Sequence, residues 1–179
     1  AVPMITVIPN VRARADDAVN PQDIYTLEHY KAFDNFINDL RDDLMPYIEA
    51  NYSILKGKEN TAIAGLSMGG RETLFIGCSM PETFGYMGAF TPAPGLLPYT
   101  NFGVSEEGLF SKETLTLPEG CNNFIMINAG LSDGIVSIWP ETYHKTLEAN
   151  GTENVFYITE GGHDFVVWKN GLYNFVKNI

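Results

Sequence analysis

Three residues whose side chains can act together in nucleophilic catalysis occur in the chain order serine, aspartate, histidine: Ser67, Asp133 and His163. A serine hydroxyl is a weak nucleophile until a neighbouring base removes its proton. An imidazole, with an ordinary pKa of about 6.5, can act as that base and can later return the proton to the leaving group. A carboxylate holds the imidazole in the required tautomer and stabilises its protonated form. Together the three side chains would carry out acyl transfer.

Ser67 lies in "IAGLSMGGRETLFIG" (63–77), where an apolar run stops at a Gly-x-Ser-x-Gly motif and a helical pattern follows. One interpretation is a tight strand-to-helix connection that needs the small residues Gly65 and Gly69. The other is a nucleophile elbow, a strained turn that exposes the serine hydroxyl at the top of a sheet. In an elbow, the backbone N–H of Met68 and the positive end of the following helix would stabilise an oxyanion.

Asp133 and His163 also follow runs that are typical of strands. Asp133 lies in "LSDG" after the run at 124–128, and His163 follows the run at 154–159. Taken alone, Asp133 is compatible with a turn and His163 with a loop histidine. Ligands of parallel sheets bind beyond the carboxyl ends of the strands. Because all three residues fall at such ends, in the chain order of α/β-hydrolases, we interpret them as a catalytic triad.

The other titratable residues give weaker signals. His29 and His144 fall within helical patterns and are interpreted as solvated or core-edge side chains. Asp164 adjoins His163, so its side chain should point elsewhere and fix the loop. The sequence contains no Cys/His spacing typical of zinc sites and no glycine-rich loop with a lysine for phosphate. We therefore expect no metal and no organic cofactor.

The segments that must position the triad alternate between strand and helix patterns. The apolar runs are continuous and rich in β-branched residues, which is typical of strands covered on both faces. Strands are predicted at 4–8, 61–65, 86–90, 124–128 and 154–159, and helices at 26–52, 69–78, 138–149 and 165–178. Pro46 should kink or divide the first helix, because proline lacks a backbone donor. The alternation predicts an α/β fold with a doubly wound, mainly parallel sheet.

The residues at 91–113 form a long stretch rich in proline, glycine and aromatic residues. Its position after a predicted strand favours an irregular loop with a role over the active site. Candidates for the wall of a substrate pocket are Phe90, Tyr99, Phe102, Ile135, Trp139, Phe165 and Trp168, with core packing as the alternative for each. Ile135, Trp139 and Phe90 are the preferred substrate-binding residues, and Trp168 is expected to pack beneath the histidine loop.

Composition limits the class of protein. A chain of 179 residues can form one domain with a substantial core. The net charge of −11 disfavours nucleic acid and anionic membranes as partners and suits an uncharged or cationic substrate. No apolar run approaches the roughly 20 residues of a membrane span. Cys78 and Cys121 are interpreted as buried free thiols, with a disulfide as the alternative.

Four segments carry a resemblance to a known family: "PYIEANYSI", "AIAGLSMGGRETLFIG", "FGYMGAF" and "EGGHDFVVWKNGLYNF". They resemble carbohydrate esterase family 1, especially the feruloyl esterase domains appended to bacterial xylanases. The resemblance spans nearly the whole chain and implies an α/β-hydrolase fold, with Ser67 as nucleophile, Asp133 as orienting acid and His163 as base. It also implies a secreted, extracellular enzyme whose substrate is a feruloyl or related hydroxycinnamoyl ester on arabinoxylan.

The resemblance is incomplete at the N-terminal side. Family members carry a further segment there, including an "HG" turn that donates the second oxyanion N–H, and nothing in this sequence matches it. A strand of that segment would lie between those predicted at 4–8 and 61–65. We therefore expect residues 1–179 to be the C-terminal portion of a single α/β-hydrolase domain. The missing N-terminal segment would then be a partner, as a second chain or a cleaved piece.

The leading hypothesis is a serine esterase that hydrolyses feruloyl esters on xylan through an acyl-enzyme. One alternative is an acetylxylan esterase or another short-acyl carboxylesterase, because the resembling family includes such enzymes. A second is acyl transfer to an acceptor other than water, since the same triad serves both reactions. An alternative of another class is a non-catalytic, polysaccharide-associated α/β module that retains a dead site.

Overall fold

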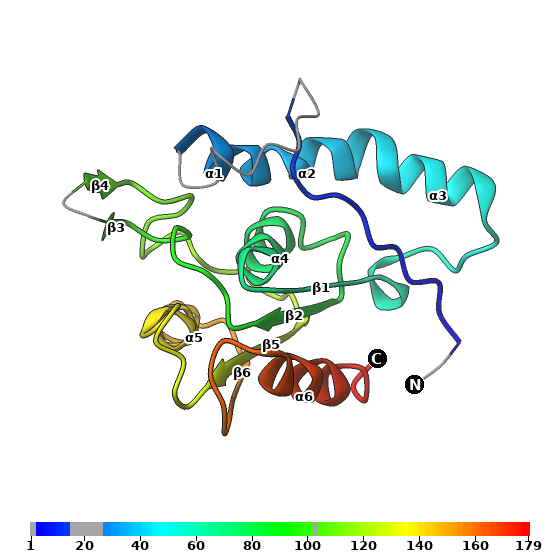
Figure 1. Cartoon of the computed structure of the whole chain (residues 1–179). Coiled ribbons are helices and arrows are strands. Elements are labelled where there is room, and N and C mark those ends of the chain that lie inside the picture. The colour runs from blue at the N-terminus through cyan, green and yellow to red at the C-terminus, as the bar shows by residue number, and fades with distance from the viewer. Residues whose placement is uncertain (1–2, 15–26, 102–103) are drawn as a thin grey trace. The chain divides into compact units, whose positions relative to one another are not determined.

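The computed structural model describes residues 3–14, 27–101 and 104–179. The chain divides into two compact units, of which the smaller spans Pro3–Leu55 and the larger contains Lys56–Ile179. Figure 1 shows the course of the chain through both. Each unit is described by itself.

The larger unit contains a four-stranded parallel sheet with the order β1-β2-β5-β6. Its strands are β1 (Ala62–Leu66), β2 (Tyr86–Phe90), β5 (Phe124–Gly130) and β6 (Val155–Thr159). Four of the predicted strands are thus confirmed, with small differences at their ends. Since every pair is parallel, all four carboxyl ends lie on one edge of the sheet.

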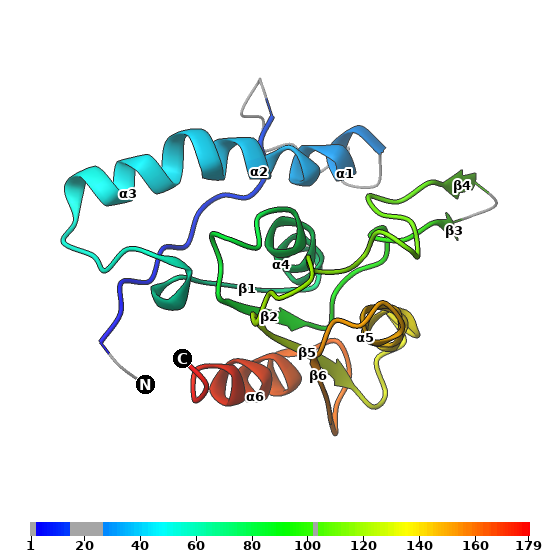
Figure 2. The same cartoon turned by 180° about the vertical axis from the view of Figure 1, so that it is seen from behind.

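Helices cover both faces of this sheet, as Figures 1 and 2 show from opposite sides. Helices α4 (Met68–Ser79) and α5 (Trp139–Ala149) pack on one face, and α6 (Phe165–Phe175) packs on the other. Successive residues of a strand point to opposite faces. In β2, Ala89 therefore joins the cluster beneath α4 and α5, while Phe90 packs against α6. The doubly wound α/β class predicted from the sequence is confirmed.

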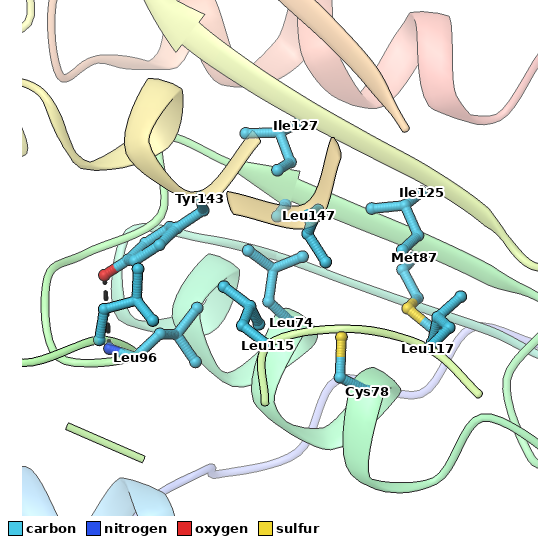
Figure 3. Packing of buried hydrophobic residues seen from close by; sticks show 12 residues of the cluster. Leu74, Cys78, Met87, Leu96, Leu115, Leu117, Ile125, Ile127, Tyr143 and Leu147 are labelled. Carbon is cyan, nitrogen blue, oxygen red and sulfur yellow. Dashed lines mark hydrogen bonds between the residues drawn. The ribbon is translucent and has the colours of Figure 1, made fainter. Parts of the chain in front are cut away.

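The main hydrophobic core lies between the sheet and the helices α4 and α5 (Figure 3). Leu74, Ile127 and Leu147 are fully buried there, and burying each such side chain stabilises the fold by about 1.5–3 kcal/mol. The buried Tyr143 hydroxyl donates to the carbonyl of Ala93 at 2.9 Å. This bond fixes the segment that follows β2 against α5.

The segment at 91–113 is less irregular than predicted. It contains an antiparallel hairpin of β3 (Tyr99–Asn101) and β4 (Val104–Glu106), which the sequence analysis missed. Ahead of the hairpin, Leu96 and Leu97 are buried in the main core. The first part of the segment is therefore a packed part of the fold. A short 3-10 helix, η3 (Lys58–Asn60), precedes β1.

The smaller unit is mainly helical. It contains α1 (Leu27–Asp34), α2 (Phe36–Asp39), a π-helical turn η2 (Leu40–Leu44) and α3 (Met45–Asn51). The N–H of Met45 donates to the carbonyl of Leu40, five residues back, and Pro46 follows in the first turn of α3. The expected division at Pro46 is not seen, because the chain is helical without a break from Phe36 to Asn51 and only changes from π to α geometry before the proline. The helix is interrupted at Asn35 instead.

The strand predicted at 4–8 is wrong. Residues 3–14 contain no regular secondary structure, and the side chain of Ile8 is 89% exposed. A β-branched run becomes a strand only where a neighbour accepts its backbone hydrogen bonds and covers its side chains. Within the unit, Ala13 N–H donates to the Ala32 carbonyl at 3.0 Å, and the Ala13 carbonyl accepts from the Asn35 amide at 3.2 Å. These bonds tie the segment to a helix rather than to a sheet.

Both cysteines are free thiols, as interpreted from the sequence. Cys78 is buried, and this burial raises the pKa of its thiol to about 12. Cys121 is only half-buried, so the expectation of burial holds for Cys78 alone. Across the described residues, every helix is too short or too polar to cross a membrane.

Candidate active site

The structure brings Ser67, Asp133 and His163 together at the carboxyl edge of the sheet. Ser67 follows β1, Asp133 follows β5 and His163 follows β6. The Oγ atom of Ser67 lies 2.9 Å from Nε2 of His163, and Nδ1 of His163 lies 2.8 Å from Oδ2 of Asp133. This continuous line of hydrogen bonds can move a proton off the serine while the carboxylate stabilises the imidazolium.

Ser67 sits on a strained corner, with φ 53° and ψ −116°. A non-glycine residue at positive φ costs on the order of 1–3 kcal/mol and persists only where its surroundings hold it. Here the Ser67 N–H donates to the Phe90 carbonyl at 2.9 Å, and the Ser67 carbonyl accepts from Ala93 at 3.0 Å. The Ser67 side chain does not cap α4, so its hydroxyl stays available to His163.

Gly65 makes this corner possible. A Cβ atom at Gly65 would lie 2.4 Å from the backbone carbonyl carbon of Gly69, well inside van der Waals contact. Gly69 differs, because a Cβ there would meet no atom within 4 Å. The close approach of strand and helix therefore demands glycine at position 65 but sets no such steric demand at position 69.

Met68 is the first residue of α4. The backbone N–H groups in the first turn of a helix have no carbonyl partner inside that helix. They also lie at the positive end of the helix dipole. The Met68 N–H is therefore suited to donate a hydrogen bond to a ligand oxygen next to Ser67.

Asp133 is almost fully buried, with 8% of its surface exposed. While Oδ2 faces His163, Oδ1 accepts from the N–H groups of Ile135 at 2.9 Å and Val136 at 3.1 Å. Buried carboxylates are costly unless they are hydrogen-bonded. Asp133 thus forms a turn, with which its local sequence is compatible, and the same bonds aim its second oxygen at the imidazole.

Asp164 fixes the loop that carries His163. Its carboxylate accepts from the Gly162 N–H at 3.1 Å and caps α6 by accepting from Val166 at 2.8 Å and Val167 at 3.2 Å. These bonds, led by the one from Gly162, lower the pKa of Asp164 from its ordinary value. As expected from the sequence, the side chain is turned to the loop and the helix rather than to the triad.

Trp168 packs against the imidazole, in line with its expected place beneath the histidine loop. The centroids of the His163 and Trp168 rings are 5.1 Å apart, at an interplanar angle of 88°. The indole N–H of Trp168 donates to the hydroxyl of Thr91 at 2.7 Å. Sequence reasoning missed Thr91, since nothing in its local sequence marks it except its position directly after a strand.

The predicted substrate-binding residues fall in different environments. Ile135 is 74% exposed, two residues past Asp133. Trp139 is half-buried and packs edge-to-face against Tyr99, with ring centroids 5.9 Å apart. Both positions are compatible with a pocket wall.

Phe90 is placed in the core, with 4% of its surface exposed, and packs edge-to-face against Phe175 at a centroid distance of 6.1 Å. This enclosure is at odds with the predicted role of Phe90 in substrate binding. It is fixed by the alternation along β2, which turns the ring toward α6. Phe102 lies outside the described residues.

The two remaining histidines pack against aromatic side chains. His29 is 8% exposed and packs edge-to-face on Phe33, while His144 stacks on Phe156 with ring centroids 4.8 Å apart. Within the ranges that the structure describes, no three His, Cys, Asp or Glu side chains are grouped so as to hold a metal ion.

Comparison with known proteins gives one family match and several relatives. The family model Esterase matches residues 1–179. A ferulic acid esterase from Anaeromyces mucronatus, solved in complex with ferulic acid, superposes with a TM-score of 0.87 and 40% identity over 94% of this chain and 62% of its own. An endo-1,4-beta-xylanase/feruloyl esterase of Xylanibacter ruminicola is 29% identical over 150 residues, which cover 82% of this chain and 18% of that protein.

A more distant relative is the iron(III) salmochelin esterase of Escherichia coli, 28% identical over 148 residues that cover 76% of this chain and 35% of that protein. The chain thus spans less than two thirds of the length of each of these relatives. The family model, in contrast, covers the chain from end to end, including all three strand ends at which the triad residues meet. On these grounds the chain belongs to the Esterase family.

Proposed function

We propose that this chain carries the catalytic triad of a serine carboxylic-ester hydrolase that acts on feruloyl or related hydroxycinnamoyl esters of xylan. The observation that carries this proposal is the line of hydrogen bonds from Ser67 Oγ through the imidazole of His163 to Asp133 Oδ2. Ser67, His163 and Asp133 are the nucleophile, the base and the orienting acid.

The proposed reaction proceeds in two halves. His163 Nε2 takes the proton of Ser67 as Oγ bonds to the ester carbonyl carbon, and the Met68 N–H donates to the resulting oxyanion. Nε2 then gives the proton to the departing sugar oxygen as the ester C–O bond breaks, which leaves an acyl-serine. In the second half, water gives a proton to Nε2 as its oxygen bonds to the acyl carbon. The bond between that carbon and Ser67 Oγ then breaks, Nε2 returns the proton to Oγ, and the free hydroxycinnamic acid leaves.

The choice of substrate rests on the relatives and on the surface beside the triad. The Anaeromyces mucronatus enzyme is a ferulic acid esterase, and the Xylanibacter ruminicola protein combines xylanase and feruloyl esterase in its name. Ile135 and Phe165, each two residues from a triad member, are 74% and 63% exposed. Such apolar side chains suit an aromatic acyl group, and Trp139 is a further candidate for this wall. A net charge of −11 suits a neutral polysaccharide, which an enzyme of this kind would meet outside the cell.

We also propose that a further segment of the same domain pairs with β1. In the described chain β1 pairs with β2 alone, and Ala62, Ala64 and Leu66 are exposed along it. The sequence predicted a strand of this segment between 4–8 and 61–65. Since residues 4–8 form no strand, the proposed segment would pair with the edge of β1. The 62% coverage of the Anaeromyces mucronatus enzyme leaves room for a segment that pairs there and brings a second oxyanion N–H. Removing one such donor typically costs about 2.7–4 kcal/mol of transition-state stabilisation.

A fluorophosphonate probe on the natural protein tests the triad. We expect the probe to attach to Ser67, and Ser67→Ala to abolish both labelling and most hydrolysis of methyl ferulate, by on the order of 10⁶-fold in kcat. Labelling at another residue, or a Ser67→Ala variant with normal turnover, would contradict the proposal. A protein that is never labelled would favour the non-catalytic module.

The acyl group is tested by comparing kcat/KM for methyl ferulate and p-nitrophenyl acetate. A preference for methyl ferulate supports the feruloyl assignment, and a strong preference for the acetyl ester would replace it with a short-acyl esterase. Adding an alcohol acceptor separates hydrolysis from transfer, because a transferase forms the new ester in place of free ferulic acid.

A further inference from the structure

Thr91 has a backbone conformation that its residue type disfavours. Its φ is 43°, and its side chain is fully buried. For a β-branched residue, a positive φ is a genuine outlier that folded proteins keep only where something holds it. Its N–H donates to the carbonyl of Asn128 in β5 at 2.8 Å, so the strained residue is anchored to the neighbouring strand.

The Thr91 side chain has a defined partner. Its Oγ1 atom lies 2.7 Å from the indole nitrogen of Trp168, 77 residues further along the chain. An indole N–H can only donate, so the threonine hydroxyl is the acceptor. Thr91 leaves the end of β2, and Trp168 lies in the first turns of α6. The bond therefore joins the segment behind the nucleophile corner to the helix behind the histidine loop.

Trp168 in turn limits the movement of His163. The imidazole is held at Nδ1 by Asp133 and meets Ser67 at Nε2. The hydrogen bond at Nδ1 alone does not fix the orientation of the imidazole ring. A rotation of the ring would move Nε2 away from the serine. The Trp168 ring, perpendicular to the imidazole at a centroid distance of 5.1 Å, obstructs that rotation. Phe165 packs on the same indole at 5.0 Å.

We propose that Thr91 and Trp168 are positioning residues for His163: the Thr91 hydroxyl fixes the indole, and the indole keeps the imidazole aligned with Ser67. This inference rests on the proposed function, in which His163 is the base. It gives the strained backbone at Thr91 a purpose, because that conformation is the one in which its buried hydroxyl meets the indole.

The test uses a matched pair of substitutions in the natural protein. Thr91→Val keeps the shape and the β-branch but removes the acceptor, whereas Thr91→Ser keeps the hydroxyl. Fluorophosphonate titration counts the active sites, so that kcat for methyl ferulate is expressed per labelled site. We expect Thr91→Val to lower this kcat by about tenfold with KM within twofold, because small misplacements of a base are costly. Thr91→Ser should restore most of it.

A merely structural role gives a different result. Thr152 is also buried, and its hydroxyl accepts from the Leu117 N–H at 2.9 Å, between loop segments of the core. Thr152→Val is therefore the control. It should lower the melting temperature and the number of labelled sites while leaving turnover per site unchanged. If Thr91→Val behaves in the same way, the positioning role is overturned and the proposed function stands.

Two further outcomes are decisive. Should Thr91→Val fail to fold, Trp168→Phe provides a second measurement, since it keeps an aromatic ring beside His163 but removes the indole donor and one of the two fused rings. Normal turnover per site in Trp168→Phe would overturn the inference. A wild-type protein with no label on Ser67 would overturn the proposed function, and the positioning role with it.

Discussion

The corner after β1 and the corner after β6 both join a strand to a helix, and both carry a triad residue. Ser67 occupies the first with φ 53° and no side-chain cap on α4. At the second, His163 is followed by Asp164, which has an ordinary φ of −146° and caps α6 with its carboxylate. Ser67 is thus placed by backbone strain and by the absence of a side chain at Gly65, and His163 by polar atoms and ring packing.

At both corners the triad side chain does not cap the following helix. At α4 no side chain caps the helix, so Ser67 Oγ can bond to His163. At α6 the adjacent Asp164 takes over the cap, so the imidazole of His163 can bond to Asp133. The contrast teaches that the two corners should fail in different ways. The first should be sensitive to added volume and the second to lost hydrogen-bond acceptors.

The largest effect is expected from Gly65→Ala. Its methyl group would lie 2.4 Å from the Gly69 backbone, so the corner cannot keep its geometry. We expect loss of fluorophosphonate labelling and a strongly lowered melting temperature. Gly69→Ala is the matched control and should fold normally, because its methyl group meets no atom within 4 Å. Equal behaviour of the two variants would refute the steric account of this corner.

Asp133→Asn should have the next largest effect. An amide in place of Oδ2 stops the carboxylate from fixing the imidazole tautomer, which lowers kcat by on the order of 10⁴-fold in triads of this type. The turn at 133–137 should survive, because the remaining carbonyl oxygen can still accept from Ile135 and Val136. Steady-state kinetics on methyl ferulate provide the measurement. A loss of less than tenfold would mean that Asp133 does not orient His163.

Removing the cap at the second corner should have a moderate effect. Asp164→Ala leaves the N–H groups of Gly162, Val166 and Val167 without their acceptor. Loss of an N-cap lowers the melting temperature of a chain of this size by roughly 2–4 °C. Asp164→Ser, which keeps a capping oxygen, should recover part of the loss in calorimetry. A wild-type melting temperature for Asp164→Ala would show that the loop is held by other means.

The smallest expected effect is on acid stability. The pKa of Asp164 is lower in the folded chain than its ordinary value, first through the bond from Gly162. Its stabilising contribution is therefore present above the unfolded pKa of about 3.9 and is lost as the pH falls through the lower, folded value. Melting temperatures of wild type and Asp164→Asn should accordingly converge as the pH falls from 5 toward 3. A constant difference over this range would contradict the assignment.

The sequence predicted correctly those strands whose pairing partners lie in the described chain, together with the helices that cover them. Four strands and the three helices that pack on them appeared as expected, because each apolar run has a partner in the sheet. The same kind of run at 4–8 formed no strand, since nothing in the described chain pairs with it. A local pattern expresses a propensity, and pairing decides whether a strand forms.

The candidate site was predictable where its geometry follows from strand ends, as for Ser67, Asp133 and His163. The site could not be predicted for residues of a strand that helices cover on both faces, because the sequence does not show which face each residue joins. Phe90 was expected in a pocket and lies in the core, because only the phase of β2 decides which face it joins. Thr91 escaped notice, since its bond to Trp168 spans 77 residues.

The buried thiol of Cys78 can report when the core beneath α4 opens. A thiol reagent attacks the ionised, accessible form, and Cys78 offers neither at neutral pH, since its surroundings raise its pKa to about 12. Alkylation of Cys78 therefore requires the core beneath α4 to open. The half-buried Cys121, in the same molecule, supplies the reference rate against which such openings can be timed.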